Sequence, residues 1–332
     1  MPKSLVTGGA GFMGSHVCDV LLAMGHVVVV LDDLSGGFEE NVPRGARLVV
    51  GDVADEAAVD RLFREEPFDY VYHLAAYAAE GLSHFIKRFN YRNNLIGSVN
   101  LINAAVNGGT VKGFIFTSSI AVYGSGQLPM TEDMAPRPED SYGIAKLAVE
   151  MELRASHEVF GLPFIIFRPH NVYGERQNIG DKYRNVIGIF MNRILQSRPL
   201  TVFGDGEQTR AFTHIDDVAP VIARSIERKE AWGETFNVGA DRPYTVKELA
   251  ETVGRAMGAR PEIHHLPARL EVKHAYSSHD KARRIFGDLV PGVSLENGVS
   301  RMAAWVRGHG SRKSRDFDGI EIRKNLPPSW LE

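Results

Sequence analysis

Short apolar runs rich in β-branched residues alternate with longer amphipathic stretches along the first half of the chain. Runs of this kind, bounded by turn residues, predict strands that are buried on both faces. The six runs are SLVTG, HVVVVLD, ARLVVGD, YVYHLA, GFIFTSS and PFIIFRP. Helical patterns such as GSHVCDVLLAMG and YGIAKLAVEMELRASHEVFG lie between them. This alternation predicts an α/β fold with a doubly wound parallel sheet that helices cover on both faces.

The alternation fades after about residue 170, where loops, prolines and polar aromatic residues become more frequent. We therefore expect a large sheet domain over residues 1–170, a smaller C-terminal α/β substrate-binding lobe over residues 171–320 and a tail over residues 321–332. The segment FTHIDDVAPVIARSIER followed by GETFNVG again has the pattern of a helix and a strand, so the chain is expected to return to the first domain around residues 211–240. GHGSRKSRDFDG, residues 308–319, is predicted to be an exposed linker.

The composition is that of an ordinary soluble globular protein, with 44% hydrophobic and 24% charged residues among 332. The net charge is −3 and no segment is strongly basic, so a nucleic acid partner is not expected. No apolar stretch approaches the roughly 20 residues that span a bilayer, and the opening MPKSLVTGGAG leaves no room for a signal peptide, so we expect a cytoplasmic protein without membrane contact. Cys18 is the only cysteine and is predicted to be a small core residue, which leaves no disulfide or thiolate metal site.

A glycine-rich turn, TGGAGFMG, follows the first predicted strand and opens the first predicted helix. Its glycines satisfy both the GxGxxG and the GxxGxxG spacing and are Gly8, Gly9, Gly11 and Gly14. Glycines at such a turn let backbone N–H groups and a helix N-terminus approach a pyrophosphate. Asp32 ends the second strand 18 residues after Gly14, where a carboxylate binds the adenosine ribose and repels a 2′-phosphate. The sequence therefore predicts a Rossmann domain that binds NAD rather than NADP, with Asp52 and Val53 at the adenine edge.

The segment SYGIAK places Tyr142 and Lys146 four residues apart, and on a helix these positions share one face. The ammonium of Lys146, together with the positive ring of nicotinamide, is expected to lower the pKa of the phenol from about 10 toward neutrality. Tyr142 can then act as a general base near pH 7. A tyrosine and a lysine at this spacing occur by chance in many helices. A catalytic role for Tyr142 and Lys146 is favoured because the serine-bearing strand end TSSIAVYG lies just upstream and the dinucleotide-binding turn opens the same domain.

These motifs together resemble the extended short-chain dehydrogenase/reductase family, and within it the NAD-dependent nucleotide-sugar epimerases and dehydratases, above all the UDP-glucose (UDP-galactose) 4-epimerases. The matching segments, in order over nearly the whole chain, are TGGAGFMG, Asp32, HLAA, TSSIAVYG, YGIAK and RPHNVYG. The resemblance implies a catalytic triad of Ser119, Tyr142 and Lys146, in which Ser119 bonds to the sugar hydroxyl that is oxidised. It also implies that Asn94 supports the active site. The NAD contacts that it implies are Gly8, Gly11, Phe12, Met13, Gly14, Asp32, Asp52, Val53, Leu74, Ala75, Tyr142 and Lys146.

The strand end TSSIAVYG narrows the reaction within this family. In the family's 4,6-dehydratases the corresponding segment resembles TDEVYG, where Asp and Glu are the acid and base that eliminate water, and the related decarboxylases keep the Glu. Ile120 and Ala121 occupy these two places here and cannot transfer a proton. The resemblance therefore implies a 4-epimerase, in which Tyr142 removes the proton of the 4-hydroxyl while hydride leaves C4 for NAD⁺. The 4-ketose then turns over and is reduced on its other face.

The same resemblance implies the residues that hold the substrate. Those expected to contact the nucleotide sugar are Ser119, Asn171, Asn185, Val186, Arg210 and Arg269. Arginine suits the diphosphate because its planar guanidinium pairs two phosphate oxygens at once. The expected substrate is UDP-glucose or UDP-galactose, since Tyr276, seven residues after Arg269, is expected to narrow the pocket against an N-acetyl group. Ala78 stands where many UDP-galactose 4-epimerases have a lysine.

Several alternatives stay open. The substrate can instead be UDP-glucuronic acid or UDP-N-acetylglucosamine, or the enzyme can be a dehydratase whose proton donors are Glu80 or His170. A protein that binds NAD(H) as a regulator without activity is a further alternative, which the intact triad disfavours. No histidine has partners at metal-ligand spacing, so no metal is expected, although His170 and His214 lie near the predicted substrate loop. Helical patterns at 86–108 and 142–160 match helices that form a dimer interface in relatives, so a homodimer is expected.

Overall fold

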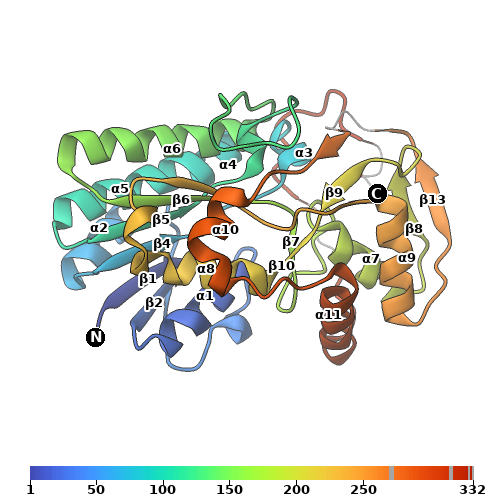
Figure 1. Cartoon of the computed structure of the whole chain (residues 1–332), viewed down its shortest axis with the longest axis horizontal. Coiled ribbons are helices and arrows are strands. Elements are labelled where there is room, and N and C mark those ends of the chain that lie inside the picture. The colour runs from blue at the N-terminus through green and yellow to red at the C-terminus, as the bar shows by residue number, and fades with distance from the viewer. Residues whose placement is uncertain (269–272, 314–316, 328–329, 331–332) are drawn as a thin grey trace.

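The chain folds around one seven-stranded sheet, seen in the computed structural model of the protein (Figure 1). The structure describes residues 1–268, 273–313, 317–327 and 330. In spatial order the strands are β11 (Thr235–Val238), β6 (Phe164–Pro169), β5 (Gly113–Thr117), β4 (Tyr70–His73), β1 (Lys3–Thr7), β2 (Val27–Asp32) and β3 (Arg47–Val50). Every neighbouring pair of strands is parallel. The predicted doubly wound parallel sheet is therefore confirmed.

The order of the strands along the chain reverses at the centre of this sheet. From β1 the chain adds β2 and β3 on one side, and it then crosses to β4 and adds β5, β6 and β11 on the other. The crevice beyond the carboxyl ends of β1 and β4 is where doubly wound sheets bind ligands. The central strands are mainly apolar because both faces of the sheet are covered, and Phe114, Ile115 and Phe116 of β5 have no exposed surface.

Helices cover both faces of the sheet (Figure 1). Those on one face are α1 (Phe12–Ala23), α8 (Ala219–Arg224) and α10 (Asp280–Phe286), and those on the other are α2 (Glu56–Glu65), α5 (Gly97–Gly108) and α6 (Ser141–Phe160). α6 begins where the Asp140 side chain accepts a hydrogen bond from the Gly143 N–H, and it ends at Gly161, whose φ of +74° suits glycine. Cys18 is buried in the first of these layers, as expected for a core residue.

A second lobe with its own hydrophobic core has its helices beside the sheet domain (Figure 1). Helices α7 (Val186–Leu195), α9 (Val246–Met257) and α11 (Leu295–His309) surround this core. The strands of this lobe form three small sheets, which are β7 (Val172–Tyr173) with β10 (Thr213–His214), β8 (Leu200–Phe203) with β13 (Ile263–Leu266), and β9 (Thr209–Ala211) with β12 (Pro243–Thr245) and β14 (His274–Ala275). The short helices near the site are α3 (Glu80–Ser83), α4 (Lys87–Tyr91), the π-helical η2 (Arg92–Ile96) and the 3₁₀-helical η3 (Ile120–Val122).

The chain crosses between the two parts more than once. α8 and β11 belong to the sheet domain although they follow the first strands of the second lobe, in the region where the sequence pattern predicts a return. α10 also packs on the sheet domain through Phe286, which the sequence pattern did not indicate. The predicted domain limits 1–170, 171–320 and 321–332 remain predictions, because segments that follow residue 170 return to the sheet domain.

Most of the described residues of the linker predicted for 308–319 are exposed, as predicted, but the segment is anchored to its surroundings. The N–H of Arg312 donates to the Asn192 side chain of α7 at 2.9 Å, and its guanidinium lies 3.7 Å from the centre of the Phe38 ring. Phe317 packs into an aromatic cluster of the sheet domain. The segment is therefore fastened to both parts of the molecule.

No helix among the described residues combines the length and the apolar composition that crossing a membrane requires. Among the same residues, no group of three or more histidine, cysteine, aspartate and glutamate side chains converges as a metal site would need.

Candidate active site

A large cavity lies between the sheet domain and the second lobe. Its volume is about 2870 Å³, and its walls come from the β1–α1 turn, the ends of β2, β4 and β5, the start of α6, the loop after β6 and the start of α7. Every predicted cofactor contact lines this cavity. The predicted substrate contacts that line it are Ser119, Asn171, Asn185, Val186 and Arg210. Arg269 lies outside the described residues. The structure thus brings the two predicted groups of residues to one place.

The glycine turn is built so that backbone atoms face the cavity. Gly8 has a φ of +73°, and a Cβ at this position would lie 2.8 Å from the backbone nitrogen of Ala75. A Cβ on Gly14 would lie 2.2 Å from the carbonyl oxygen of Gly8, so α1 can approach the turn only without a side chain here. The first N–H groups of α1 and the positive end of its dipole consequently meet the cavity, which fits a pyrophosphate.

Two backbone hydrogen bonds fix Asp32 at the end of β2. Its carboxylate accepts from the Ala10 N–H at 3.0 Å and from the Leu34 N–H at 2.9 Å. Burial raises the pKa of Asp32, and these hydrogen bonds oppose that shift. Asp52 and Val53 line the adjoining part of the cavity. The residues present therefore fit NAD, with Asp32 at the ribose and the glycine turn at the pyrophosphate.

Ser119, Tyr142 and Lys146 meet on the cavity wall. Ser119 follows β5, and its Oγ accepts a hydrogen bond from the Ala121 N–H at 3.1 Å. Tyr142 lies in the first turn of α6, and the neighbouring Ser119 side chain acts to lower the pKa of its phenol. Lys146 lies one turn later, where its ammonium donates to the Thr117 carbonyl at 2.8 Å and is 5.7 Å from the centre of the Tyr142 ring. The three side chains are thus close enough to act on one substrate hydroxyl.

Burial dominates the electrostatics of this site. It raises the pKa of Tyr142, and the Glu80 carboxylate raises that pKa further. Burial also lowers the pKa of Lys146 to about 7, against the opposing effect of Glu150. Lys146 alone therefore does not lower the pKa of the phenol. The predicted shift toward neutrality needs the second charge on which it was based, the positive ring of nicotinamide.

Sequence and fold both match one group of known proteins. Residues 4–239 match the model of the NAD-dependent epimerase/dehydratase family. This chain belongs to that family. It is 33% identical to a UDP-glucose 4-epimerase of Mycolicibacterium smegmatis, over 92% of this chain and 98% of that protein. Two similar solved structures are UDP-glucose 4-epimerases, one of Thermotoga maritima with UDP-glucose (TM-score 0.87, 35% identity, 92% of this chain and 99% of that chain) and one of Thermus thermophilus with NAD (TM-score 0.85, 32% identity, 92% and 99%).

Membership of the NAD-dependent epimerase/dehydratase family confirms NAD as the cofactor. It also confirms the resemblance from which the triad was assigned.

A buried ion pair stabilises the strand end that carries this triad's serine. Arg168 of β6 donates to both carboxylate oxygens of Glu150 in α6, at 2.9 and 2.5 Å, and both side chains are almost fully buried. Ser118 donates its hydroxyl proton to the same carboxylate at 2.5 Å, which leaves Ser119 to face Tyr142. Sequence reasoning missed Glu150, although it lies four residues after Lys146 on the same face of α6.

Asn94 holds the loop that follows β4. Its Oδ1 accepts from the Tyr77 N–H at 2.8 Å, and its Nδ2 donates to the Tyr77 carbonyl at 3.1 Å and to Asn90 Oδ1 at 2.7 Å. Asn94 is buried within the π-helical η2, a rare conformation that often occurs at functional sites. Tyr77 of this loop and Glu80 at the start of α3 line the cavity, so these contacts favour the supporting role that the family resemblance implied for Asn94.

The second lobe contributes the opposite wall of the cavity. Asn171, with a φ of +41°, donates from Nδ2 to the Ala211 carbonyl at 3.1 Å. Arg210 of β9 donates to the Lys273 carbonyl at 3.0 Å, which orients its guanidinium. Asn185 precedes α7, and both it and Val186 line the cavity, so the N-terminus of α7 opens onto it. A helix N-terminus and an arginine together form a favourable environment for a diphosphate.

Three other predicted contacts have different outcomes. Ala275 lines the cavity whereas Tyr276 lines a separate small hollow, so the prediction that Tyr276 narrows the sugar pocket is wrong. His214 is fully buried with its Nε2 3.4 Å from the Glu175 carboxylate, and it does not line the cavity. His170 does line the cavity, but both of its ring nitrogens contact other protein groups.

The C-terminal tail forms part of the cavity wall, which sequence reasoning missed. Its cavity-lining residues are Ile322, Lys324, Asn325, Leu326, Pro327 and Trp330. The Trp330 ring packs edge-on against Phe85, with 5.9 Å between the ring centres. Glu321 accepts hydrogen bonds from two backbone N–H groups of α4, both at 3.0 Å, and so fastens the tail to the sheet domain. The tail has one aromatic residue, Trp330, and this is the sequence feature that could have indicated the contact.

Proposed function

We propose that this protein is an NAD-dependent 4-epimerase that interconverts UDP-glucose and UDP-galactose. The observation that carries the proposal is the strand end after β5, where Ser119, Ile120 and Ala121 line the cavity beside Tyr142. These positions offer a hydroxyl for hydrogen bonding but no carboxylate that could eliminate water from the sugar. The similarity to UDP-glucose 4-epimerases supports the choice of sugar.

The triad residues act on the 4-hydroxyl of the sugar in this proposal. NAD, when bound, supplies the acceptor and donor of hydride for C4 and a positive charge beside Tyr142. Tyr142 takes the proton of the 4-hydroxyl, and Ser119 stabilises the negative charge that develops on the oxygen. Lys146 keeps a positive charge near the phenol when it is protonated. After the ketone has turned over in the cavity, C4 takes the hydride back on its opposite face and Tyr142 returns the proton to the same oxygen.

The nucleotide of the substrate lies against the second lobe in this proposal. Arg210 and the N-terminus of α7 neutralise the diphosphate, and the Asn171 side chain orients it. Asn185 and Val186 at the start of α7 contact the uridine. Arg269 is assigned to the diphosphate as well, on the resemblance to the family alone.

A homodimer is part of the same proposal. Ile144 and Met151 are exposed on α6 seven residues apart, and Ile96 is exposed at the end of η2, just before α5. Exposed apolar side chains on neighbouring helices support pairing with a second copy. Light scattering after gel filtration is expected to give twice the chain mass, and a monomer would contradict this part.

UDP-sugars and NAD are cytoplasmic metabolites, which supports a cytoplasmic location that cell fractionation can test.

The test of the function is proton NMR of the purified protein without added NAD. It is incubated separately with UDP-glucose, UDP-galactose, UDP-glucuronic acid and UDP-N-acetylglucosamine. One new anomeric signal that grows to an equilibrium from either UDP-glucose or UDP-galactose is the expected result. The same behaviour with only one of the other two sugars would replace the substrate and keep the chemistry. NAD retained without turnover of any sugar would favour a regulator that binds NAD(H).

A dehydratase remains the second candidate, because Glu80 lines the cavity and its charge acts on Tyr142. Elimination of water would yield a product lighter by one water with a new deoxy or vinyl signal. The variant Glu80→Gln separates the two chemistries, since it would abolish elimination by this carboxylate while a 4-epimerase keeps its triad.

A further inference from the structure

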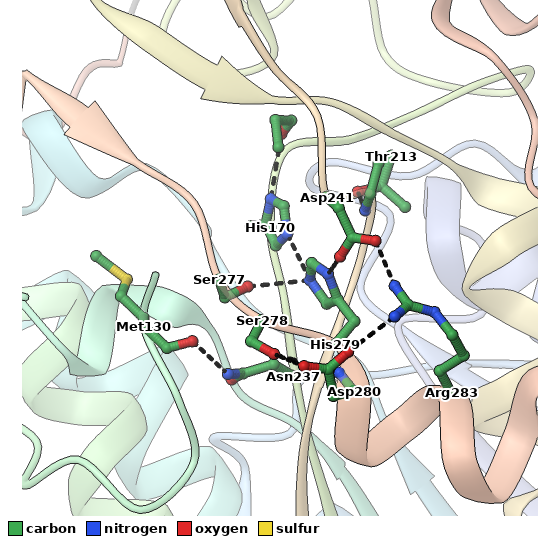
Figure 2. Close-up of polar contacts among 12 residues, drawn as sticks. Met130, His170, Thr213, Asn237, Asp241, Ser277, Ser278, His279, Asp280 and Arg283 are labelled. Atoms are coloured by element: carbon green, nitrogen blue, oxygen red, sulfur yellow. Dashed lines mark hydrogen bonds and ion pairs between the residues drawn. The ribbon is translucent and has the colours of Figure 1, made fainter. Parts of the chain in front are cut away.

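Two buried histidines form a polar contact that the proposed reaction does not use (Figure 2). His170 follows β6 and stands next to Asn171, and His279 lies just before α10. The two residues are 3% and 4% exposed, and their Nε2 atoms are 2.9 Å apart. A Cβ at Gly239 would lie 2.2 Å from His170 Nε2, so the ring is tightly enclosed. We call His170 and His279 the histidine pair.

The outer nitrogen of each ring also has a partner. His170 Nδ1 is 3.1 Å from the carbonyl oxygen of Ala211, and His279 Nδ1 is 2.7 Å from Asp241 Oδ1. Asp241 is paired in turn with Arg283 of α10 (Figure 2). The charged side chains around the pair, from the loop after β11 and from α10, are Asp241, Arg283 and Asp280. The histidine pair is therefore part of a longer series of hydrogen bonds and ion pairs that runs from α10 to β9.

The contacts of the pair fix how many protons it carries. A hydrogen bond to a carbonyl, one between two ring nitrogens and one to a carboxylate each need one N–H. These three hydrogen bonds need three N–H groups, and two neutral imidazole rings have only two. The Ser277 hydroxyl, 3.0 Å from His279 Nε2, can donate to that nitrogen but leaves the two Nε2 lone pairs facing each other. The hydrogen bond from His279 lowers the pKa of Asp241, so the missing proton is not on this carboxylate. The pair therefore carries a third proton and one positive charge.

The environment decides which ring is charged. His279 Nδ1 contacts the Asp241 carboxylate, which favours a positive charge on that ring, whereas His170 Nδ1 contacts the carbonyl oxygen of Ala211. Burial lowers the pKa of His170, which agrees with a neutral ring. The charged ring is therefore His279, which donates from Nδ1 to Asp241 and from Nε2 to His170. His170 accepts at Nε2 and donates from Nδ1 to the Ala211 carbonyl. With this assignment every ring nitrogen of the pair has a matched partner.

We propose that His279 is a positioning residue, which as an imidazolium held by Asp241 fixes the tautomer of His170 and thereby the segment that carries Asn171. The Ala211 carbonyl that accepts from His170 also accepts from Asn171 Nδ2 at 3.1 Å. Ala211 directly follows Arg210 in β9. The charge on His279 thus acts at the junction between the two residues assigned to the diphosphate. Their role rests on the proposed function, whereas the protonation of His279 does not.

Loss of the proton from His279 breaks this arrangement. Neutral His279 keeps its N–H toward Asp241, so its Nε2 becomes an acceptor and His170 has to place its only N–H between the rings. His170 then has no proton for the Ala211 carbonyl, and the segment that carries Asn171 loses one of its anchors. Binding of UDP is expected to weaken by roughly three- to tenfold, the loss that corresponds to one hydrogen bond.

The protonation is tested by NMR of the full-length protein labelled with ¹⁵N in its histidine rings. A long-range ¹H–¹⁵N spectrum at pH 6.5 reports which ring nitrogens carry protons, and the His279→Gln variant assigns the signals. Two protonated nitrogens in His279, with one protonated and one bare nitrogen in His170, are expected. A His279 ring with one bare nitrogen at this pH would overturn the proposal.

The consequence is tested by calorimetric titration with UDP, which requires no turnover. Asp241→Asn removes the carboxylate that holds the imidazolium, so we expect binding at pH 8 to be three- to tenfold weaker than in the wild type and the difference to shrink at pH 6. Asp280→Asn is the matched control, because Asp280 contacts Arg283 but not His279, and it is expected to bind like the wild type. A loss in Asp241→Asn that does not vary with pH would reduce the pair to a structural contact and refute the proposal. Wild-type protein that does not bind UDP would instead count against the proposed function, and the NMR result would still decide the protonation.

Discussion

Replacing Glu150 with glutamine tests whether the buried ion pair stabilises the strand end that carries Ser119. The substitution keeps the size of the side chain but removes its charge, which leaves the Arg168 guanidinium buried without a carboxylate. The Ser118 hydroxyl also loses its charged acceptor. Removal of one partner from a buried pair costs about 3–5 kcal/mol, because the remaining charge stays desolvated.

The expected fall in melting temperature follows from the length of the chain. An entropy of unfolding of about 2.1 cal/mol/K per residue gives about 0.7 kcal/mol/K for 332 residues. A loss of about 3–5 kcal/mol therefore lowers Tm by about 4–7 °C. The same substitution removes the charge that raises the pKa of Lys146, so this pKa is expected to fall below its value in the wild type.

Scanning calorimetry of the wild type, Glu150→Gln and Glu158→Gln is the assay. Glu158 is exposed near the end of the same helix, so its substitution is expected to change Tm by less than about 1 °C. A Glu150→Gln protein that melts at the same temperature as Glu158→Gln would refute the reasoning, because the buried guanidinium would then have found a different partner at no cost.

Three further predictions concern the pocket and its surroundings. In the cofactor-free protein the free energy of unfolding is expected to rise with pH between about 7 and 10.5, because folding lowers the pKa of Lys146 and the unfolded chain binds one more proton in that range. Denaturant titrations at several pH values should show a smaller rise in Lys146→Met than in the wild type. An equal rise in the two proteins would contradict the assignment of this pKa to Lys146. Trp330→Ala removes an aromatic part of the cavity wall and is expected to raise KM for the UDP-sugar about fivefold, as the loss of about 1 kcal/mol of binding would, whereas the exposed Arg323→Ala in the same tail leaves steady-state kinetics unchanged. Asn94→Ala removes three hydrogen bonds, two of them to Tyr77. At about 1 kcal/mol for each bond, the substitution is expected to lower Tm by about 3–6 °C and to reduce kcat. A variant that melts at the wild-type temperature would show that the loop after β4 does not depend on Asn94.

Local patterns were sufficient to predict the sheet and the turn that faces the cofactor. The buried strands are rich in apolar and β-branched residues because both faces of the sheet are covered, and this pattern can be recognised from each segment alone. The glycine spacing after β1 is equally local, since the close approach of Gly14 to Gly8 arises within one turn. The spacing of Tyr142 and Lys146 places them on one face of a helix whatever the rest of the chain does.

The parts that sequence reasoning missed depend on contacts between distant segments. His279 meets His170 across 109 residues, and neither segment has a pattern that marks the other as its partner. Trp330 in the tail closes part of the cavity in a similar way, because an aromatic side chain on an aperiodic segment does not indicate where it will pack. The direction of the Tyr142 pKa could not be predicted either, since it is set by burial, and burial follows only from the assembled fold.

The fate of deuterium at C4 of UDP-glucose tests the 4-epimerase assignment most directly. The purified protein is incubated with UDP-glucose carrying deuterium at C4, in ordinary water and without added NAD, and the product is analysed by proton NMR and mass spectrometry. The expected product is UDP-galactose of unchanged mass that retains the deuterium at C4, with no turnover in Tyr142→Phe. A product lighter by one water, exchange of the deuterium with solvent, or undiminished turnover in Tyr142→Phe would contradict the assignment.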